Sequence, residues 1–163
     1  MGNTSISFEP VSGTVLPRFA GIPTFMRLPN IALNHPDIAK VDIGLVGVPW
    51  DAGTTNRPGA RHGPRQLRDL STMIRAVHPH TGVNPFKLVN CADLGDCPVN
   101  PADIHDCLTY ITDFYDEMHE KNIVPLTGGG DHLVSLPILR GIKRKVPLSM
   151  IHIDAHTDLF DEY

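Results

Sequence analysis

The chain has 163 residues, a net charge of −4, 20% charged residues and 41% hydrophobic residues, which describes an ordinary soluble globular protein. Neither a nucleic-acid partner nor a membrane is indicated, because the net charge is mildly acidic and the longest apolar runs, at residues 44–49 and 146–153, are far too short to span a bilayer. The amino terminus lacks the basic and apolar regions of a signal peptide, so we expect a cytoplasmic protein.

Residues 1–40 are irregular and rich in proline, which favours an arm over the protein surface rather than part of a sheet. Such arms often reach a neighbouring subunit. We therefore expect an amino-terminal arm at residues 1–40 with a role in oligomer contact, followed by a single α/β domain at residues 41–163.

From residue 41 onward, short apolar runs alternate with stretches of helical spacing. Strands are predicted at residues 41–48, 88–93, 123–127 and 148–153, and helices at residues 64–77, 102–120 and 133–145. The helix at 102–120 carries apolar residues at helical spacing, namely Ile104, Leu108, Ile111 and Phe114. Strands that alternate with helices in this way indicate a mostly parallel sheet with right-handed crossovers and helices on both faces, a three-layer α/β/α arrangement.

The loop after the first strand, at residues 53–63, holds candidates for a substrate pocket, because loops in this position often contribute to ligand sites in α/β folds. Thr54, Thr55 and Asn56 offer hydrogen bonds to a polar substrate. The same region carries four basic residues that either form an anion site or make structural ion pairs, namely Arg57, Arg61, His62 and Arg65.

The three cysteines, Cys91, Cys97 and Cys107, are an odd number without metal-type spacing. We therefore expect free thiols in a reducing compartment and assign them no function.

A glycine-rich turn follows the strand at 123–127, where Gly128, Gly129 and Gly130 precede Asp131 and His132. Glycine lets the backbone turn sharply and approach other segments closely. No Gly-Lys-Ser/Thr sequence follows, so a turn that presents His132 is favoured over a phosphate loop.

Three potential metal ligands, Asp154, His156 and Asp158, recur at every second residue after the apolar run that ends at residue 153. On an extended backbone these side chains point to one side, and the carboxyl ends of parallel strands share a crevice, so His132 is expected beside them. His152 has the opposite parity and is expected to face away in a packing role. The alternative for the pattern alone is a solvated strand end.

Mixed carboxylate and imidazole ligands favour a divalent ion such as manganese, with nickel, iron, cobalt and zinc as alternatives. No cysteine belongs to the cluster, and a carboxylate-rich site at a crevice is better suited to activating water than to stabilising a fold. The chemistry indicated is hydrolysis.

Gly129–His132 and Asp154–Asp158 resemble, in the same order, the metal motifs of the ureohydrolases, the family of arginase and agmatinase. Residues 47–65 resemble the loop and helix start of the agmatinase-like branch, and residues 17–29 look most like the arm of bacterial guanidinopropionases and guanidinobutyrases. The resemblance implies an arginase-like fold and a urea-releasing hydrolase that acts on a guanidino acid.

The resemblance also implies two divalent ions, most simply Mn2+ with Ni2+ as an alternative. His132 and Asp158 would bind one ion, His156 the other, and Asp154 would bridge both. Asp158 would receive the proton of the nucleophile and pass it to the leaving amine. Asp131 would orient a ligand imidazole.

The substrate pocket implied by the resemblance includes Phe160 and Asp161 beside the threonines and Asn56 of the first loop. Family guanidino-acid hydrolases usually carry a small polar residue where this chain has Phe160. An aromatic ring there would remove a hydrogen bond, so a substrate with an apolar end, such as metformin or a short alkylguanidine, and guanidine itself, are alternatives.

Family members continue well beyond the position of Tyr163, so we expect this chain to be the amino-terminal half of the fold and to be inactive by itself. The missing part would carry a second carboxylate pair. The family implies a homo-oligomer, a trimer or hexamer. Two alternatives stay open: a noncatalytic partner subunit of a heteromeric hydrolase, and a single-zinc deacetylase of the same broad fold.

Overall fold

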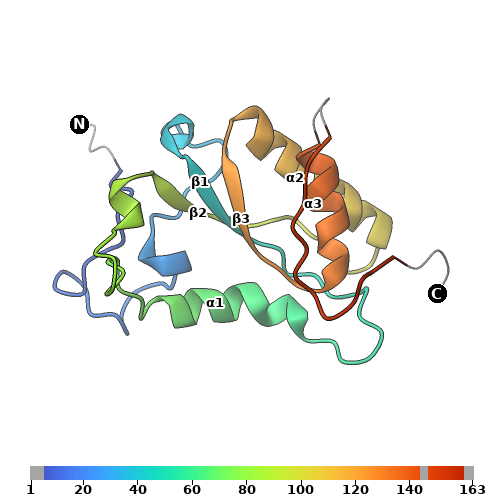
Figure 1. The fold of residues 1–163 in the computed structure, drawn as a ribbon, viewed down its shortest axis with the longest axis horizontal. Coiled ribbons are helices and arrows are strands. Elements are labelled where there is room, and N and C mark those ends of the chain that lie inside the picture. The colour runs from blue at the N-terminus through green and yellow to red at the C-terminus, as the bar shows by residue number, and fades with distance from the viewer. Residues whose placement is uncertain (1–5, 144–146, 160–163) are drawn as a thin grey trace.

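The computed structural model describes residues 6–143 and 147–159. Its centre is a sheet of three parallel strands in the order β2-β1-β3 (Figure 1), with β1 at Ile43–Gly47, β2 at Cys91–Asp96 and β3 at Val124–Gly128. β1 is the central strand, and its Ile43 lies opposite Cys91 on one side and Val124 on the other. The predicted parallel α/β architecture is confirmed.

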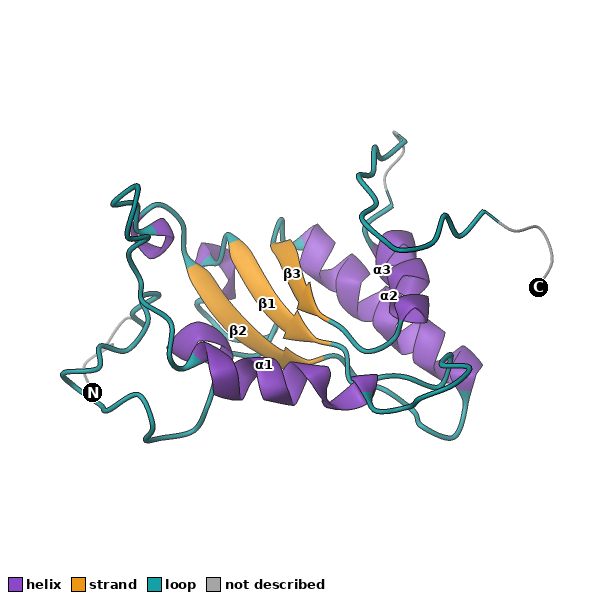
Figure 2. Ribbon diagram, turned by 60° about the horizontal axis from the view of Figure 1, so that its bottom comes forward, coloured by secondary structure: helices purple, strands orange, loops and turns teal. Residues whose placement is uncertain are grey.

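The described residues form three α-helices: α1 at Gly63–Ser71 and α2 at Ile104–Glu120, which pack against the sheet, and α3 at Ser135–Gly141, which packs on α2. Figure 2 shows α1 apart from the α2–α3 pair, with the sheet between them. Short 3-10 helices complete the list, namely η1 at Phe25–Arg27, η2 at Ile38–Lys40, η3 at Ala60–His62, η4 at Pro85–Lys87 and η5 at His132–Val134. In the described part of the chain, no helix is long and apolar enough to cross a membrane.

The two faces of β1 pack into two separate apolar clusters. Val46 and Val48 lie in the cluster that contains the buried face of α2, whereas Leu45 lies in a second cluster with Phe25. This alternation follows from the period of two along a strand. The result is the predicted order of helix, sheet and helix.

Helix α2 begins at a good N-cap, because the Asp103 carboxylate accepts hydrogen bonds from the backbone N–H groups of His105 and Asp106 at 2.7 and 3.0 Å. Its buried side chains recur at helical spacing along one face, namely Cys107, Ile111, Tyr115 and Met118. Desolvation raises the pKa of Tyr115, whose hydroxyl shares a hydrogen bond with Thr127 of β3. The helix is thereby tied to the strand that leads into the glycine turn.

In the arm at residues 1–40, Asn30 forms an isolated parallel bridge with Asp93 of β2, and Phe25 and Leu28 pack with Leu45 of β1. The fully buried Asp93 carboxylate accepts from the backbone N–H of Phe25 and pairs with Arg68 of α1, both at 2.8 Å. Arg68 also lies over the Phe25 ring, 4.2 Å from its centroid. One carboxylate thus joins the arm, the sheet and α1.

All three cysteines are free and buried.

Several predicted boundaries are wrong. Helix α1 ends at Ser71 instead of residue 77, and α3 ends at Gly141 instead of residue 145. β2 begins at Cys91 instead of residue 88, because residues 88–90 form the turn that follows η4. The strand predicted at 148–153 is absent: residues 147–153 have no regular structure, and Ile151 and Ile153 are 92% and 93% exposed. A strand needs a neighbouring backbone, and this segment has none among the described residues.

Candidate metal centre

The turn after β3 is fixed by its contact with the end of β1. The backbone N–H of Asp131 donates to the carbonyl oxygen of Trp50 at 2.8 Å. A Cβ on Gly130 would lie 1.6 Å from that same oxygen, so only glycine fits there. The Asp131 carboxylate also accepts from the backbone N–H of Leu133 at 3.1 Å and caps η5. His132 is therefore the first residue of a capped turn whose position is set by Trp50.

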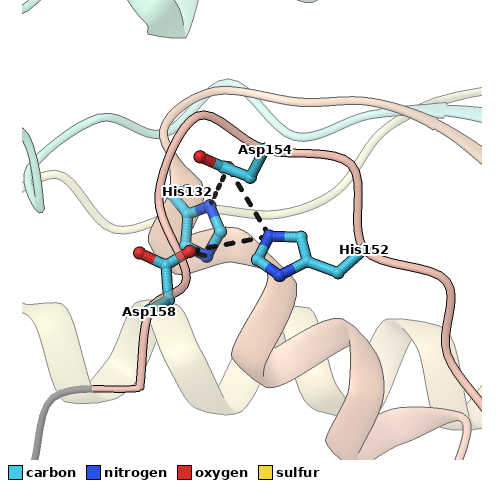
Figure 3. Close-up of side chains that lie close together, drawn as sticks. All are labelled: His132, His152, Asp154 and Asp158. Atoms are coloured by element: carbon cyan, nitrogen blue, oxygen red, sulfur yellow. Dashed lines mark ion pairs between the residues drawn. The ribbon is translucent and has the colours of Figure 1, made fainter.

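Four side chains converge in front of this turn (Figure 3): His132, His152, Asp154 and Asp158. Each offers one ligand atom, and these atoms all lie within 4.8 Å of one another. Nδ1 of His132 is 3.4 Å from Oδ2 of Asp154, and Nε2 of His132 is 3.4 Å from Oδ2 of Asp158. Nε2 of His152 lies 3.6 Å from Asp154 and 3.5 Å from Asp158.

The two oxygens of Asp154 face different imidazoles. Oδ2 faces His132 and His152, whereas Oδ1 lies 3.6 Å from Nδ1 of His156. Oδ1 also accepts the backbone N–H of His156 at 2.9 Å. This hydrogen bond holds the pKa of Asp154 below its ordinary value, and His152 and His132 lower that pKa further. Asp154 is thus ionised and lies between two groups of donors.

The structure brings together three of the four predicted ligands, namely His132, Asp154 and Asp158. His156 lies beside the cluster and is 78% exposed, and His152 takes a place within it. The expectation that His152 faces away is wrong here, because it used the alternation of side chains along a strand and the segment is not a strand. Asp158 itself has a left-handed backbone, with φ of 53°.

Asp131 has partners different from the predicted imidazole. Its two oxygens accept backbone N–H groups: Oδ1 accepts that of Leu133, and Oδ2 accepts that of Gly53 at 2.7 Å. The sequence contained part of this signal, since an Asp directly before a helical stretch is a common cap, and Asp131 directly precedes η5. The contact with Gly53 joins residues distant in sequence and had no local signal.

The loop after β1 is held by the buried carboxylate of Asp51. That carboxylate accepts from the backbone N–H groups of Gly59 and Arg61, at 2.6 and 3.1 Å, and pairs with the Arg61 guanidinium. The hydrogen bond from Arg61 is the main cause that lowers the pKa of Asp51 to about 2. Arg61 therefore forms a structural ion pair with Asp51, which is one of the two roles that the sequence predicted for the basic residues of this region.

A cavity of ≈ 350 Å³ lies beside the cluster. His132, His152 and Asp158 line it together with mostly apolar side chains, namely Leu133, Leu136, Leu139, Met150 and Leu159. The predicted pocket residues of the first loop, Thr54, Thr55 and Asn56, do not line this cavity, and Phe160 and Asp161 lie outside the described residues. The leucines of α3 were visible in the sequence only as helix-forming residues.

Comparison with known proteins places these features in a family. Residues 41–163 match the sequence model of the arginase family. The chain is 53% identical over 155 residues to the guanidinopropionase of Pseudomonas aeruginosa and 43% identical over 154 residues to the guanidinobutyrase of the same organism, with 95% and 94% of this chain covered. It spans 48% of each of these relatives.

Solved structures agree on the fold. The proclavaminate amidino hydrolase of Streptomyces clavuligerus superposes with a TM-score of 0.71 at 37% identity, over 77% of this chain and 40% of that one. A hypothetical agmatinase from Burkholderia thailandensis superposes with a TM-score of 0.69 at 31% identity, over 76% of this chain and 39% of the other. The arginase-like fold is thereby confirmed for the part present here, which corresponds to about half of the full fold.

Proposed function

Because the chain belongs to the arginase family, we propose that it supplies the amino-terminal half of a hydrolase that releases urea and an amine from a small guanidino compound. The observation that carries the proposal is the convergence of His132, Asp154 and Asp158 at the end of β3. The substrate is proposed to be a guanidino acid of the guanidinopropionate or guanidinobutyrate type, on the strength of the identities with the two Pseudomonas enzymes.

The donor set fits a divalent metal ion. Nitrogen and oxygen ligands lie about 2.0–2.2 Å from such an ion, so donors on opposite sides of it are separated by up to about 4.4 Å. The four donor atoms lie within 4.8 Å of one another, so small side-chain movements would close the site. Two imidazoles and two carboxylates suit Mn2+, with Ni2+ as an alternative.

We propose two ions, with Asp154 between them. Support comes from its two oxygens, since Oδ2 faces His132 and Oδ1 faces His156. His132 and Asp158 are proposed for the first ion and His156 for the second. His152 competes with this assignment, because it lies among the donors of the first ion.

Bound divalent ions would lower the pKa of water and stabilise the negative charge that develops during attack on the guanidinium carbon. Asp158 is the proposed catalytic residue, because it is at the edge of the cluster, is 42% exposed, and lines the cavity. Its carboxylate would take a proton from the attacking water and return it to the leaving amine.

A second candidate substrate class is favoured by the cavity itself. The apolar side of the cavity beside Asp158 is formed by Leu133, Leu136, Leu139, Met150 and Leu159, and no lysine or arginine among the described residues lines the cavity to pair with a substrate carboxylate. A guanidino compound with an apolar end, such as metformin or a short alkylguanidine, fits such a lining. We keep this class, and guanidine, as alternatives to the guanidino acids.

The arm at residues 1–40 is proposed as an oligomer contact. Phe19 and Ile22 are each 92% exposed, and Val15 is 79% exposed. Apolar side chains this exposed gain free energy when a neighbouring chain covers them. A homo-oligomer, a trimer or hexamer, is the proposed assembly.

The test is urea release by the full-length protein, loaded separately with Mn2+ and Ni2+. The substrates are 3-guanidinopropionate, 4-guanidinobutyrate, agmatine, arginine, guanidine and metformin. Turnover of a guanidino acid supports the first proposal, and turnover of metformin or guanidine alone supports the second class. No urea from any of them would contradict both proposals and leave the noncatalytic partner subunit and the single-zinc deacetylase as the remaining alternatives.

A matched pair of variants decides the metal ligands. His156→Ala should reduce the bound metal from two ions to one per chain, whereas His152→Ala should leave two. Metal content after equilibrium dialysis measures both. The reverse result would assign the ligand to His152 and contradict the proposed role of His156.

A further inference from the structure

The Asp131 carboxylate connects two loops that are distant in sequence. Oδ1 accepts the backbone N–H of Leu133 in the metal-site turn, and Oδ2 accepts the backbone N–H of Gly53 in the loop after β1. A Cβ on Gly53 would lie 2.9 Å from Oδ2, so the close approach depends on glycine at that position. Hydrogen bonds to an ionised carboxylate are among the strongest of their kind in proteins.

Asp131 is held in place independently of this loop contact. Its backbone N–H donates to the Trp50 carbonyl oxygen at 2.8 Å, and Gly130 approaches the same carbonyl group so closely that a Cβ would not fit. Trp50 is 4% exposed and belongs to the main apolar core. The carboxylate of Asp131 is therefore a fixed point to which the loop is attached.

The other end of the same loop has its own anchor. Asp51 accepts the backbone N–H groups of Gly59 and Arg61 and is 2% exposed. Residues 54–58 thus lie between two hydrogen-bonded ends: the N–H of Gly53 is bound by Asp131, and the N–H of Gly59 is bound by Asp51. Within the described residues, the side chains of Thr54, Thr55 and Asn56 make no hydrogen bond, so their polar groups are available to a ligand.

We propose that Asp131 is a positioning residue that fixes the loop at residues 53–56 relative to His132 and thereby sets the affinity for substrate. The effect on substrate affinity rests on the proposed function, whereas the role of Asp131 as the anchor of the loop does not. A short polar loop that is already ordered loses less conformational freedom when a ligand binds. Loss of the anchor should therefore weaken substrate binding more than the chemical step.

Asp131 both anchors the loop and caps η5, so a control variant must show the effect of losing a helix cap alone. Asp103 is the matched residue: its Oδ1 caps α2 through two backbone N–H groups, at 2.7 and 3.0 Å, and within the described residues it has no hydrogen bond to the loop at 53–56 or to the turn at 129–134. Asp103→Ala loses a cap of the same kind without any contact to the loop.

Hydrogen exchange of the full-length protein tests the structural part without any substrate. In Asp131→Ala, amides at residues 52–56 should exchange roughly tenfold to a hundredfold faster, as expected for the loss of a hydrogen bond to a charged group. Asp103→Ala should leave these amides unchanged. Unchanged exchange at 52–56 in Asp131→Ala would overturn the inference.

Kinetics test the consequence for binding. Asp131→Ala should raise KM for the guanidino substrate about tenfold or more while kcat falls less, with metal content unchanged and Asp103→Ala near the wild type. A fall in kcat or metal content with KM unchanged would show that Asp131 serves His132 alone. If the wild type releases no urea, the proposed function fails, and the exchange result still supports or overturns the anchor.

Discussion

Strand β1 and the segment at 147–159 differ in the way their apolar residues are placed. Val46 of β1 and Val48, directly after the strand, are fully buried, whereas Ile151 and Ile153 are 92% and 93% exposed. β1 has a parallel strand on each side, whereas no strand among the described residues pairs with the second segment. Residue type is similar in the two regions, so the presence of neighbouring strands decides which of them is buried.

The largest expected effect comes from closing the space at Gly130. Gly130→Ala places a methyl group 1.6 Å from the Trp50 carbonyl oxygen, so the turn after β3 must leave β1. We expect a loss of more than about 4 kcal/mol in the free energy of unfolding, measured by urea denaturation. Gly129→Ala is the matched control, because its nearest contact is 3.4 Å from Val134. Equal losses would contradict the importance of the Trp50 contact.

The next prediction compares the loss of an isoleucine side chain in the buried core with the same loss in the segment at 147–159. Ile111 of α2 is 0% exposed, so Ile111→Ala should cost about 2–5 kcal/mol by loss of burial and creation of a cavity. Ile153→Ala in the same chain should change the free energy of unfolding by less than about 0.5 kcal/mol. A cost above about 1 kcal/mol at Ile153 would break the comparison, since it would show that the segment is packed.

The sequence predicted the regions whose structure depends on local pattern. Helix α2 was predicted from the spacing of its apolar residues, and β1 and β3 were predicted from short apolar runs. The convergence of His132 with Asp154 and Asp158 was expected from the shared crevice of parallel strands. The placement of His152 was missed, because it depends on whether a strand forms, and a strand depends on residues elsewhere in the chain.

Long-range contacts of single side chains were also beyond the sequence. The bond between Asp131 and Gly53 and the pairing of Arg68 with Asp93 join elements whose distance is set by the whole packing. No local pattern distinguishes these aspartates from others on a surface. The helices and strands that carry these side chains follow from local pattern, but the partners of each carboxylate do not.

Metal addition should reduce the difference in hydrogen-exchange rate between β1 and the segment at 147–159. Mn2+ at about a hundred times its dissociation constant should slow exchange at residues 152–158 roughly a hundredfold, because binding stabilises only the bound arrangement. Amides of β1 should not respond. Asp154→Asn should abolish the slowing, since Asp154 faces donors on both sides. Equal slowing in wild type and variant would mean that the ion binds elsewhere.

The smallest effect concerns the anchor of the first loop at acidic pH. The pKa of Asp51 falls from its ordinary 3.8 to about 2, because the Arg61 side chain stabilises the carboxylate. A lowered pKa in the folded state stabilises the fold at pH values above 3.8, and this contribution disappears as the pH falls through about 2. Asp51→Asn should therefore be less stable than the wild type at pH 6, with a gap that narrows between pH 4 and 2. Trp50, the single tryptophan, precedes Asp51 and reports unfolding by its fluorescence. A gap that stays constant over this range would show that the carboxylate charge does not hold the loop.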